Sequence, residues 1–173
     1  VLRDHKKPDW AVKYVPHGID EKKYFPIVND LEFEVFKEKY LGKEDLDFVV
    51  MWNSRNIRRK NASDLILAWR TFLDQLPTER AKKCLLIMKT EPVFEHGTDL
   101  PAVIEAVCDP ELHKVKIIHE RFDDKGLNYL YNCSDAHMFM TDNEGWGLGL
   151  TESLMAGRMI IAPVQGGMQD QMR

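Results

Sequence analysis

Leu46-Asp47-Phe48-Val49-Val50-Met51-Trp52 is the stretch that decides the fold class of this chain. Only Asp47 interrupts its apolar side chains, and a strand that helices cover on both faces has this near-continuous hydrophobicity in place of strict alternation. A polar loop follows the run. Beyond the loop, apolar residues recur at the spacing of one helix face, at Leu65, Trp69, Phe72 and Leu76. The segment therefore predicts a strand, a loop and a helix of a parallel α/β sheet.

The rest of the chain repeats this alternation. Four further apolar runs are expected to be strands: Cys84 to Met88, Val115 to Ile118, Ala136 to Met140 and Met159 to Ala162. Helices are expected between the strands: one that Asn61 caps, then Ala102 to Val107, Lys125 to Asn132 and Leu150 to Ala156, with Gly157 as the last stop signal. The order βαβαβαβαβ predicts a Rossmann-like, doubly wound parallel sheet, whose ligands lie beyond the carboxyl ends of its strands.

The first 45 residues differ from the rest of the chain. Within residues 1–45, an interdomain segment, Trp10 to Pro16 is expected to form one more strand and Leu31 to Tyr40 a charged helix. Residues 46–173 are expected to form the Rossmann-like domain. Only six residues follow Gly166-Gly167, too few for a helix that covers the last strand, so we expect this domain to be truncated at its carboxyl end.

Composition restricts the class of protein. The chain has 173 residues, a formal net charge of -4, 44% hydrophobic residues and 30% charged residues, which is ordinary for one soluble domain. This mild acidity gives no general attraction for nucleic acid or anionic lipid. Cys84, Cys108 and Cys133 form no CxxC pattern, no apolar stretch reaches the roughly 18 residues of a membrane span, and no signal peptide is visible. We therefore expect a cytoplasmic protein without a transmembrane segment.

The first candidate site is the loop after the first strand, which carries several cations between a strand end and a helix start. It reads Asn53-Ser54-Arg55-Asn56-Ile57-Arg58-Arg59-Lys60-Asn61. The positive end of a helix favours an anion, and Arg and Lys add charge-assisted hydrogen bonds to phosphate oxygens. The chemistry fits a diphosphate. Arg58 and Arg59 are interpreted as a solvated part of the loop.

The second candidate site is Glu144-Gly145-Trp146-Gly147-Leu148-Gly149-Leu150-Thr151-Glu152, which follows the fourth expected strand. Its glycines remove side chains where ligand oxygens approach, and the helix that begins there offers free N–H groups to a phosphate. Glu152 is placed to accept hydrogen bonds from a vicinal diol such as a ribose. A carboxylate that only complements the helix dipole is the alternative interpretation of Glu152. The two glutamates around a glycine-rich turn favour the binding site.

Gly166-Gly167 is a third and less specific candidate, because two glycines allow close approach to a sugar or phosphate but also make any tight turn. Metal-ligand spacing is not shared by His17, His96, His113, His119 and His137. No metal is expected, and no cofactor is expected either.

With these residues in place, the chain resembles the carboxyl-terminal, nucleotide-sugar-binding domain of GT-B-fold retaining glycosyltransferases of family 4, or GT4. Val15-Pro16-His17-Gly18-Ile19-Asp20, followed by Tyr24-Phe25, looks like the segment by which the chain enters this domain in the family. Arg55 and Lys60 match the Arg and Lys that hold the donor diphosphate in the family. Glu144 and Glu152 match its E-x7-E motif, which is the most specific signal.

The resemblance implies a retaining, hexosyltransferase-type glycosyltransferase that uses a UDP- or GDP-sugar donor without a metal. It implies catalytic roles for Glu144, beside the donor sugar, and for Arg55 and Lys60, which stabilise the leaving diphosphate. It assigns the ribose hydroxyls to Glu152. The other donor-binding residues that it implies are Gly145, Gly147, Leu148, Gly149, Thr151, Gly166 and Gly167.

The resemblance also implies one half of a two-domain GT-B architecture, in which an amino-terminal domain binds the acceptor. The acceptor is unknown, and a chain without that second domain is expected to be inactive. This sequence has Gly149 where many members have Pro and His17 where they have Asn. Many members also have an acidic residue near the position of Gln169. These departures leave the choice of sugar open.

Two other functions stay open at this stage. A nucleotide-sugar epimerase of similar architecture uses the same kind of diphosphate site and rearranges the sugar nucleotide instead of forming a glycosidic bond. A non-enzymatic nucleotide- or RNA-binding module would use Arg55, Arg58, Arg59 and Lys60 and would bind with strong salt dependence. The RNA-binding alternative leaves Glu144 and Glu152 without a role, so no nucleic-acid partner is expected.

Overall fold

The computed structural model describes residues 13–172 and contains a five-stranded sheet. Its strands are β1 (Phe48–Asn53), β2 (Cys84–Lys89), β3 (Val115–Ile118), β4 (Ala136–Met138) and β5 (Met159–Ile161). All neighbouring strands pair in parallel, in the order β3-β2-β1-β4-β5. The predicted Rossmann-like, doubly wound α/β fold is confirmed.

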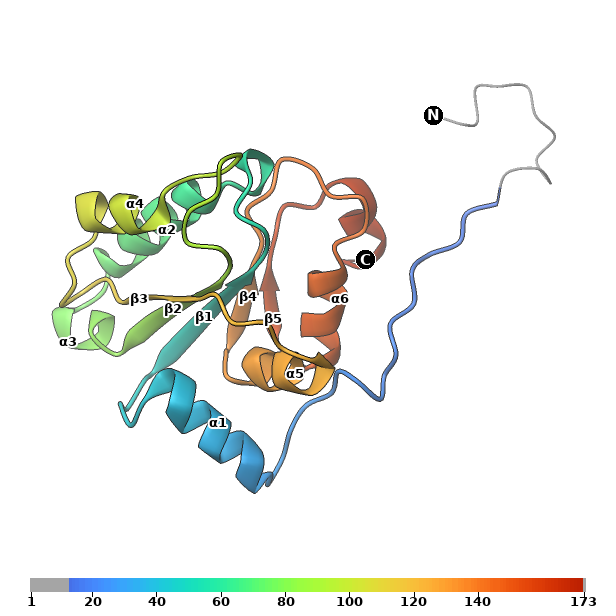
Figure 1. Ribbon diagram of the computed structural model, residues 1–173, viewed down its shortest axis with the longest axis horizontal. Coiled ribbons are helices and arrows are strands. Elements are labelled where there is room, and N and C mark those ends of the chain that lie inside the picture. Colours follow the sequence, from blue (N-terminus) through green and yellow to red (C-terminus); the bar gives the residue numbers. More distant parts are fainter. Residues whose placement is uncertain (1–12, 173) are drawn as a thin grey trace.

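Helices cover both faces of the sheet. They are α1 (Leu31–Leu41), α2 (Ala62–Leu73), α3 (Thr78–Ala81), α4 (Leu100–Val107), α5 (Asp124–Asn132) and α6 (Leu148–Met155), with two 3-10 turns, η3 (Arg58–Lys60) and η4 (Gly166–Asp170). Helices α2 and α4 lie on one face, whereas α1 and α5 lie on the other (Figure 1). Within residues 13–172, no helix is both long enough and apolar enough to cross a bilayer.

The continuous hydrophobicity of β1 follows from these two layers. Val50 and Trp52 pack in the core cluster that contains α2 and α4, whereas Val49 and Met51 pack in the cluster on the α1 and α5 side. All four side chains are at least nine-tenths buried, and burial of each removes apolar surface from water. A strand with core on both faces cannot alternate with polar residues, which is why the sequence pattern identified it.

The structure corrects the expected cap of α2. Asn61 stands at the N-cap position but has φ +47° and makes no side-chain cap hydrogen bond. Its amide instead donates to Asp142 Oδ1 at 2.6 Å. The chain enters α2 directly from η3, and this tight turn requires a left-handed residue, a conformation that Asn tolerates better than most side chains.

Two other expectations on local structure need revision. The short helix α3 is missing from the prediction, because four residues carry no readable periodicity. Of the strand expected at Trp10 to Pro16, residues 13–16 are not in a strand, and residues 10–12 lie outside the described residues. The charged helix expected at Leu31 to Tyr40 is present as α1.

The segment before α1 lies along α5. The backbone N–H groups of Phe25 and Ile27 donate to the side-chain oxygens of Asn128 and Asn132 at 3.2 and 2.9 Å. Asn132 returns a hydrogen bond to the Phe25 carbonyl at 3.0 Å. These contacts fix the segment against the α5 side of the sheet, where Tyr24 is buried.

The strand order creates a topological switch point between β1 and β4. The chain passes from β1 outward to β2 and β3 and then returns to place β4 on the other side of β1. Helix α2 follows β1 on one face, and α6 follows β4 beside α5 on the opposite face (Figure 1). The loops after β1 and β4 therefore diverge and leave a crevice at the carboxyl edge of the sheet, where ligands of such folds bind.

Asn56 joins the loop after β1 to the loop after β2. Its side chain is almost completely buried, with 1% exposure. Its amide donates to the carbonyl oxygens of Thr98 at 2.6 Å and Glu91 at 3.1 Å, and its oxygen accepts from the Thr98 N–H at 3.0 Å. One side chain thus satisfies backbone groups of a loop that is about 40 residues away in sequence.

Asn56→Ala is expected to lower the free energy of unfolding by about 1–3 kcal/mol, because the backbone groups of Glu91 and Thr98 lose their hydrogen bonds to Asn56. Urea unfolding of the variant and the parent measures this difference. Arg58→Ala is the matched control, since Arg58 belongs to the same loop and is exposed. Equal stability of Asn56→Ala and Arg58→Ala would show that Asn56 does not hold the two loops together.

Candidate functional site

Two adjoining pockets lie at the carboxyl edge of the sheet. The first has a volume of about 580 Å³ and lies over the ends of β1, β2 and β3. The second has a volume of about 380 Å³ and lies between the loop after β1 and the start of α6. The two pockets share Asn53, Ser54 and Arg55 as lining residues. One ligand with two linked parts can therefore occupy both pockets.

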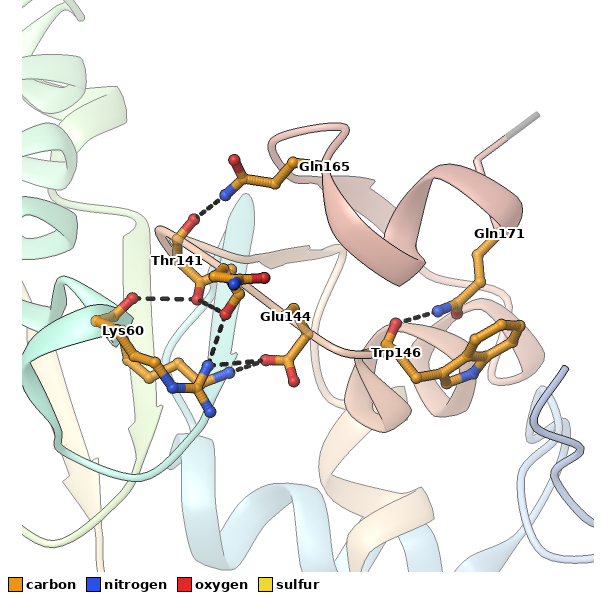
Figure 2. A network of polar contacts seen from close by, with 8 residues as sticks. Lys60, Thr141, Glu144, Trp146, Gln165 and Gln171 are labelled. Carbon is orange, nitrogen blue, oxygen red and sulfur yellow. Dashed lines mark hydrogen bonds and ion pairs between the residues drawn. The ribbon is translucent and has the colours of Figure 1, made fainter. Parts of the chain in front are cut away.

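An ion pair between Lys60 and Glu144 lies in the second pocket (Figure 2). The two side chains are only 12% and 17% exposed, and they come from residues 84 positions apart in sequence. Arg59 contributes as well, because its Nη1 lies 3.5 Å from Glu144 Oε2 and donates to the Asn143 carbonyl at 2.6 Å. Arg59 is exposed, as expected of a solvated loop residue, but its guanidinium also contacts Glu144. Arg58 remains exposed, as expected.

Hydrogen bonds to backbone carbonyl groups also hold the two loops together. Thr141 Oγ1 hydrogen bonds to the carbonyl oxygens of Arg59 and Asn143 at 3.1 and 2.9 Å, and the Asp142 N–H donates to the Arg59 carbonyl at 2.9 Å. Gln165 in turn donates to the Thr141 carbonyl at 2.5 Å (Figure 2). The loops after β1, β4 and β5 therefore form one connected unit.

Glu144 is ionised in this setting. Burial opposes its ionisation, but the hydrogen bond and charge of Lys60, together with the charge of Arg59, outweigh burial and lower the pKa of Glu144. A carboxylate held between two cations lowers the net positive charge of the pocket. Any anionic ligand of this pocket meets Lys60 and Glu144 as a pair.

The start of α6 provides backbone donors to the same pocket. Gly147 has φ +83° and stands at the N-cap position, a left-handed conformation that favours glycine. Gly147, Leu148 and Gly149 line the second pocket. The first N–H groups of a helix have no intrahelical acceptor, so this end of α6 is suited to an anion.

Gly166 and Gly167 support the pocket from behind. The Gly167 N–H donates to the Glu144 carbonyl at 3.1 Å. A Cβ at Gly166 would collide with the Glu144 carbonyl oxygen, and a Cβ at Gly167 would collide with that of Gly145. Neither glycine lines either of the two pockets among the described residues, so their position is explained by close packing of η4 on the Glu144 loop.

Glu152 lies deeper than the sequence suggested. Tyr131, which is completely buried, donates its hydroxyl to Glu152 Oε2 at 2.6 Å and accepts from Asn53 Nδ2 at 2.9 Å. Glu152 is not one of the described residues that line either pocket, but Asn53 lines both. Tyr131 thus connects Glu152 to the pocket floor, and nothing in the sequence pattern pointed to it.

Burial determines the protonation of this inner network. It raises the pKa of Glu152, although the hydrogen bonds from Tyr131 and Tyr24 oppose the shift. It also raises the pKa of Tyr131 well above its ordinary value, so this hydroxyl stays a donor. Burial lowers the pKa of His137 to about 3, and the neutral ring accepts a hydrogen bond from the Asn53 N–H at 3.2 Å.

The remaining predicted residues lie around the pockets in different ways. Arg55 is exposed and lines both pockets. Thr151 is engaged inside the domain, because it accepts from Trp146 Nε1 at 3.1 Å and bonds to Gln171, which also bonds to the Trp146 carbonyl (Figure 2). Gly145 is exposed, and a Cβ there would meet nothing within 4 Å. His17 lines the second pocket beside Trp146.

The donor set does not resemble a metal centre. Residues 13–172 contain no cluster of three or more His, Cys, Asp or Glu side chains that could hold a metal ion. The second pocket offers cationic side chains, the Glu144 carboxylate and the backbone N–H groups at the start of α6. Such groups bind phosphates and hydroxyl groups.

No protein-family model and no curated protein sequence matches the chain. Solved structures do. WaaG, a glycosyltransferase involved in lipopolysaccharide biosynthesis, has a TM-score of 0.74 and 19% identity over 98% of this chain and 43% of its own. The C-terminal domain of a glycosyl transferase group 1 family protein from Francisella tularensis has a TM-score of 0.65 and 17% identity over 87% of this chain and 72% of its own.

A third similar structure is that of an Escherichia coli protein described as trehalose-6-phosphate bound with UDP-2-fluoro glucose. Its TM-score is 0.64, with 16% identity over 88% of this chain and 37% of its own. The chain thus spans less than half the length of this protein and of WaaG. At these identities the likeness shows that the fold is that of GT-B glycosyltransferase domains.

Gly167→Ala is expected to destabilise the domain by about 1–3 kcal/mol, because the added methyl group collides with backbone that has no room to move. Gly145→Ala is the matched control, since a Cβ there meets nothing within 4 Å. Chemical unfolding of both variants checks the prediction. If the two variants are equally stable, close packing of η4 on the Glu144 loop does not matter.

Glu152→Gln is expected to raise the melting temperature at neutral pH, because the parent buries an ionised carboxylate there and the variant does not. The pKa of Glu152 is raised in the folded protein, so the parent loses stability as the pH rises through that pKa. Below the ordinary pKa of 4.5 the melting temperatures of the parent and the variant are expected to converge. The Gln oxygen still accepts from Tyr131. Melting curves across pH that run parallel for the two proteins would contradict the raised pKa.

Proposed function

We propose that this domain binds the nucleotide-sugar donor, a UDP- or GDP-sugar, of a retaining glycosyltransferase. The observation that carries the proposal is the Lys60–Glu144 pair at the amino-terminal end of α6, with Arg55 alongside. A cation, a carboxylate and free helix N–H groups around one pocket suit a diphosphate joined to a hydroxyl-rich sugar. Of the residues that carry the family resemblance, Glu144, Arg55 and Lys60 line this pocket.

In this proposal, the diphosphate lies in the second pocket. Lys60, Arg55 and the first N–H groups of α6 bind its oxygens, and they stabilise the negative charge that develops when the glycosyl bond to the diphosphate breaks. Such charge stabilisation at a leaving group is usually a large part of catalysis. The low exposure of Lys60 strengthens its interaction with an anion, since screening by water is reduced.

The two glutamates take different parts of the donor. Glu144 is ionised and lies in the pocket, where it accepts hydrogen bonds from hydroxyl groups of the sugar. Glu152 lines neither pocket but is joined to the pocket residue Asn53 through Tyr131, and in this proposal it binds the ribose hydroxyls from that deeper position. The UDP-2-fluoro glucose of the similar E. coli structure supports a nucleotide-sugar ligand for this fold.

The remaining parts of the reaction are also proposals. Transfer proceeds with retention and without a metal cofactor, and an acceptor of unknown class binds to a second domain across the cleft. The isolated domain then binds the donor without transferring the sugar. A protein with both domains that only rearranges the sugar nucleotide would instead be an epimerase.

Lys60→Ala is expected to weaken binding of UDP and GDP by about 1.5–3 kcal/mol, roughly ten- to hundredfold in Kd, because one charged hydrogen-bond donor to the diphosphate is lost. Calorimetric titration of the parent and the variant measures this change. The same titration with UDP- and GDP-sugars tests Glu152→Ala, for which a similar loss is expected.

Lys60→Ala leaves Glu144 partly buried with the more distant Arg59 as its remaining ion-pair partner, so a second variant is needed. Lys60→Met combined with Glu144→Gln removes both charges of the pair and is expected to restore stability but not diphosphate affinity. If this double variant binds UDP and GDP as the parent does, Lys60 is not the diphosphate ligand.

A further inference from the structure

The carboxylate of Glu144 is held by cations alone. Within residues 13–172 its ion-pair and hydrogen-bond partners are Lys60, in direct contact, and Arg59, at 3.5 Å. The backbone of Glu144 is fixed from behind, because the Gly167 N–H donates to its carbonyl at 3.1 Å. A rotation about the side-chain torsions of Glu144 therefore moves the carboxylate and leaves the loop in place.

This carboxylate lies where the diphosphate is proposed to bind. The Glu144 stem passes close to Gly147, the N-cap residue of α6, because a Cβ at Gly147 would come to 3.3 Å from Glu144 Cγ. Lys60, Glu144 and Gly147 all line the second pocket. A helix N-terminus and a lysine ammonium attract anions, and the anion already beside them is the Glu144 side chain.

A phosphate that reaches the Lys60 ammonium also lies beside the Glu144 carboxylate, because these two groups are in direct contact. Lys60 and Glu144 are only 12% and 17% exposed, so water screens the repulsion between the two anions less than it does at an open surface. A bare diphosphate therefore has to displace the carboxylate from Lys60.

We infer that Glu144 is a specificity-determining residue, which competes with the diphosphate for Lys60 until a sugar attached to that diphosphate relieves the competition. A nucleoside diphosphate without a sugar leaves the displaced carboxylate with Arg59, which is exposed and more distant. A nucleotide sugar supplies hydroxyl groups as well, and these donate hydrogen bonds to an ionised carboxylate. The charge of Glu144 thus favours the sugar-bearing nucleotide over the same nucleotide without its sugar.

This inference rests on the proposed function, in which Lys60 binds the diphosphate and Glu144 binds the sugar. The alternative is a permanent ion pair that only holds the two loops together, so that its loss weakens the binding of every ligand. The contacts favour the exchange of partners, because Thr141 and Asp142 already join these loops through hydrogen bonds to the Arg59 carbonyl.

The test is calorimetric titration of the full chain with two matched pairs of ligands, UDP with UDP-glucose and GDP with GDP-mannose. Glu144→Gln keeps the shape of the side chain and removes its charge. This variant is expected to bind UDP and GDP about three- to tenfold more tightly than the parent does. The nucleotide sugars are expected to gain less affinity or to lose some, so the advantage that the sugar gives to binding falls.

Two controls assign this effect to the contact with Lys60. Asp142→Asn removes a carboxylate from the same loop, but Asp142 bonds to Asn61, so all affinities are expected to stay unchanged. In a Lys60→Met background, Glu144→Gln is expected to give a clearly smaller gain for UDP and GDP, because the cation for which the two anions compete is gone.

The other outcomes separate this inference from the proposed function. If the parent binds these ligands and Glu144→Gln binds UDP and GDP equally well or more weakly, the inference is wrong and the proposed function stands. The inference is also wrong if Asp142→Asn tightens binding as much as Glu144→Gln does, or if the nucleotide sugars gain as much as UDP and GDP. If neither the parent nor Glu144→Gln binds any of the four ligands, the proposed function fails and the inference fails with it.

Discussion

The pairing of β4 with β1 is the constraint on which the site depends. It places the ends of two strands that are far apart in sequence side by side, and their loops then diverge toward α2 and α6 on opposite faces. Lys60 and Glu144 meet only because of this pairing. Two charges at low exposure require a partner, so the ion pair in turn holds the two loops at a fixed distance.

Buried polar groups give the site a second, inner layer. Asn53, Tyr131 and Glu152 form a hydrogen-bonded series that runs from the pocket floor into the domain. Each of these groups would be costly in the core without the others. The network fixes the orientation of Asn53, which both pockets share, and therefore couples the geometry of the two pockets.

At some positions, close backbone packing explains a glycine better than direct contact with a ligand does. Gly147 and Gly149 line a pocket, but Gly166 and Gly167 allow η4 to pack on the loop that carries Glu144. The position of Glu144 thus depends on the loop after β5 as well as on β4. The site is assembled from the loops after three strands, and a change in the position of any of these loops moves the Glu144 carboxylate.

The sequence by itself determined the sheet, most helices and the composition of the two loops that carry Lys60 and Glu144. Local hydrophobic patterns encode these features, because a strand buried on both faces must be apolar along its whole length. The tertiary structure alone decided that Arg59 contacts Glu144, that Tyr131 holds Glu152 and that Asn56 joins two loops. Each of these is a contact of one polar side chain with a residue at least 20 positions away, and no local periodicity records such a contact.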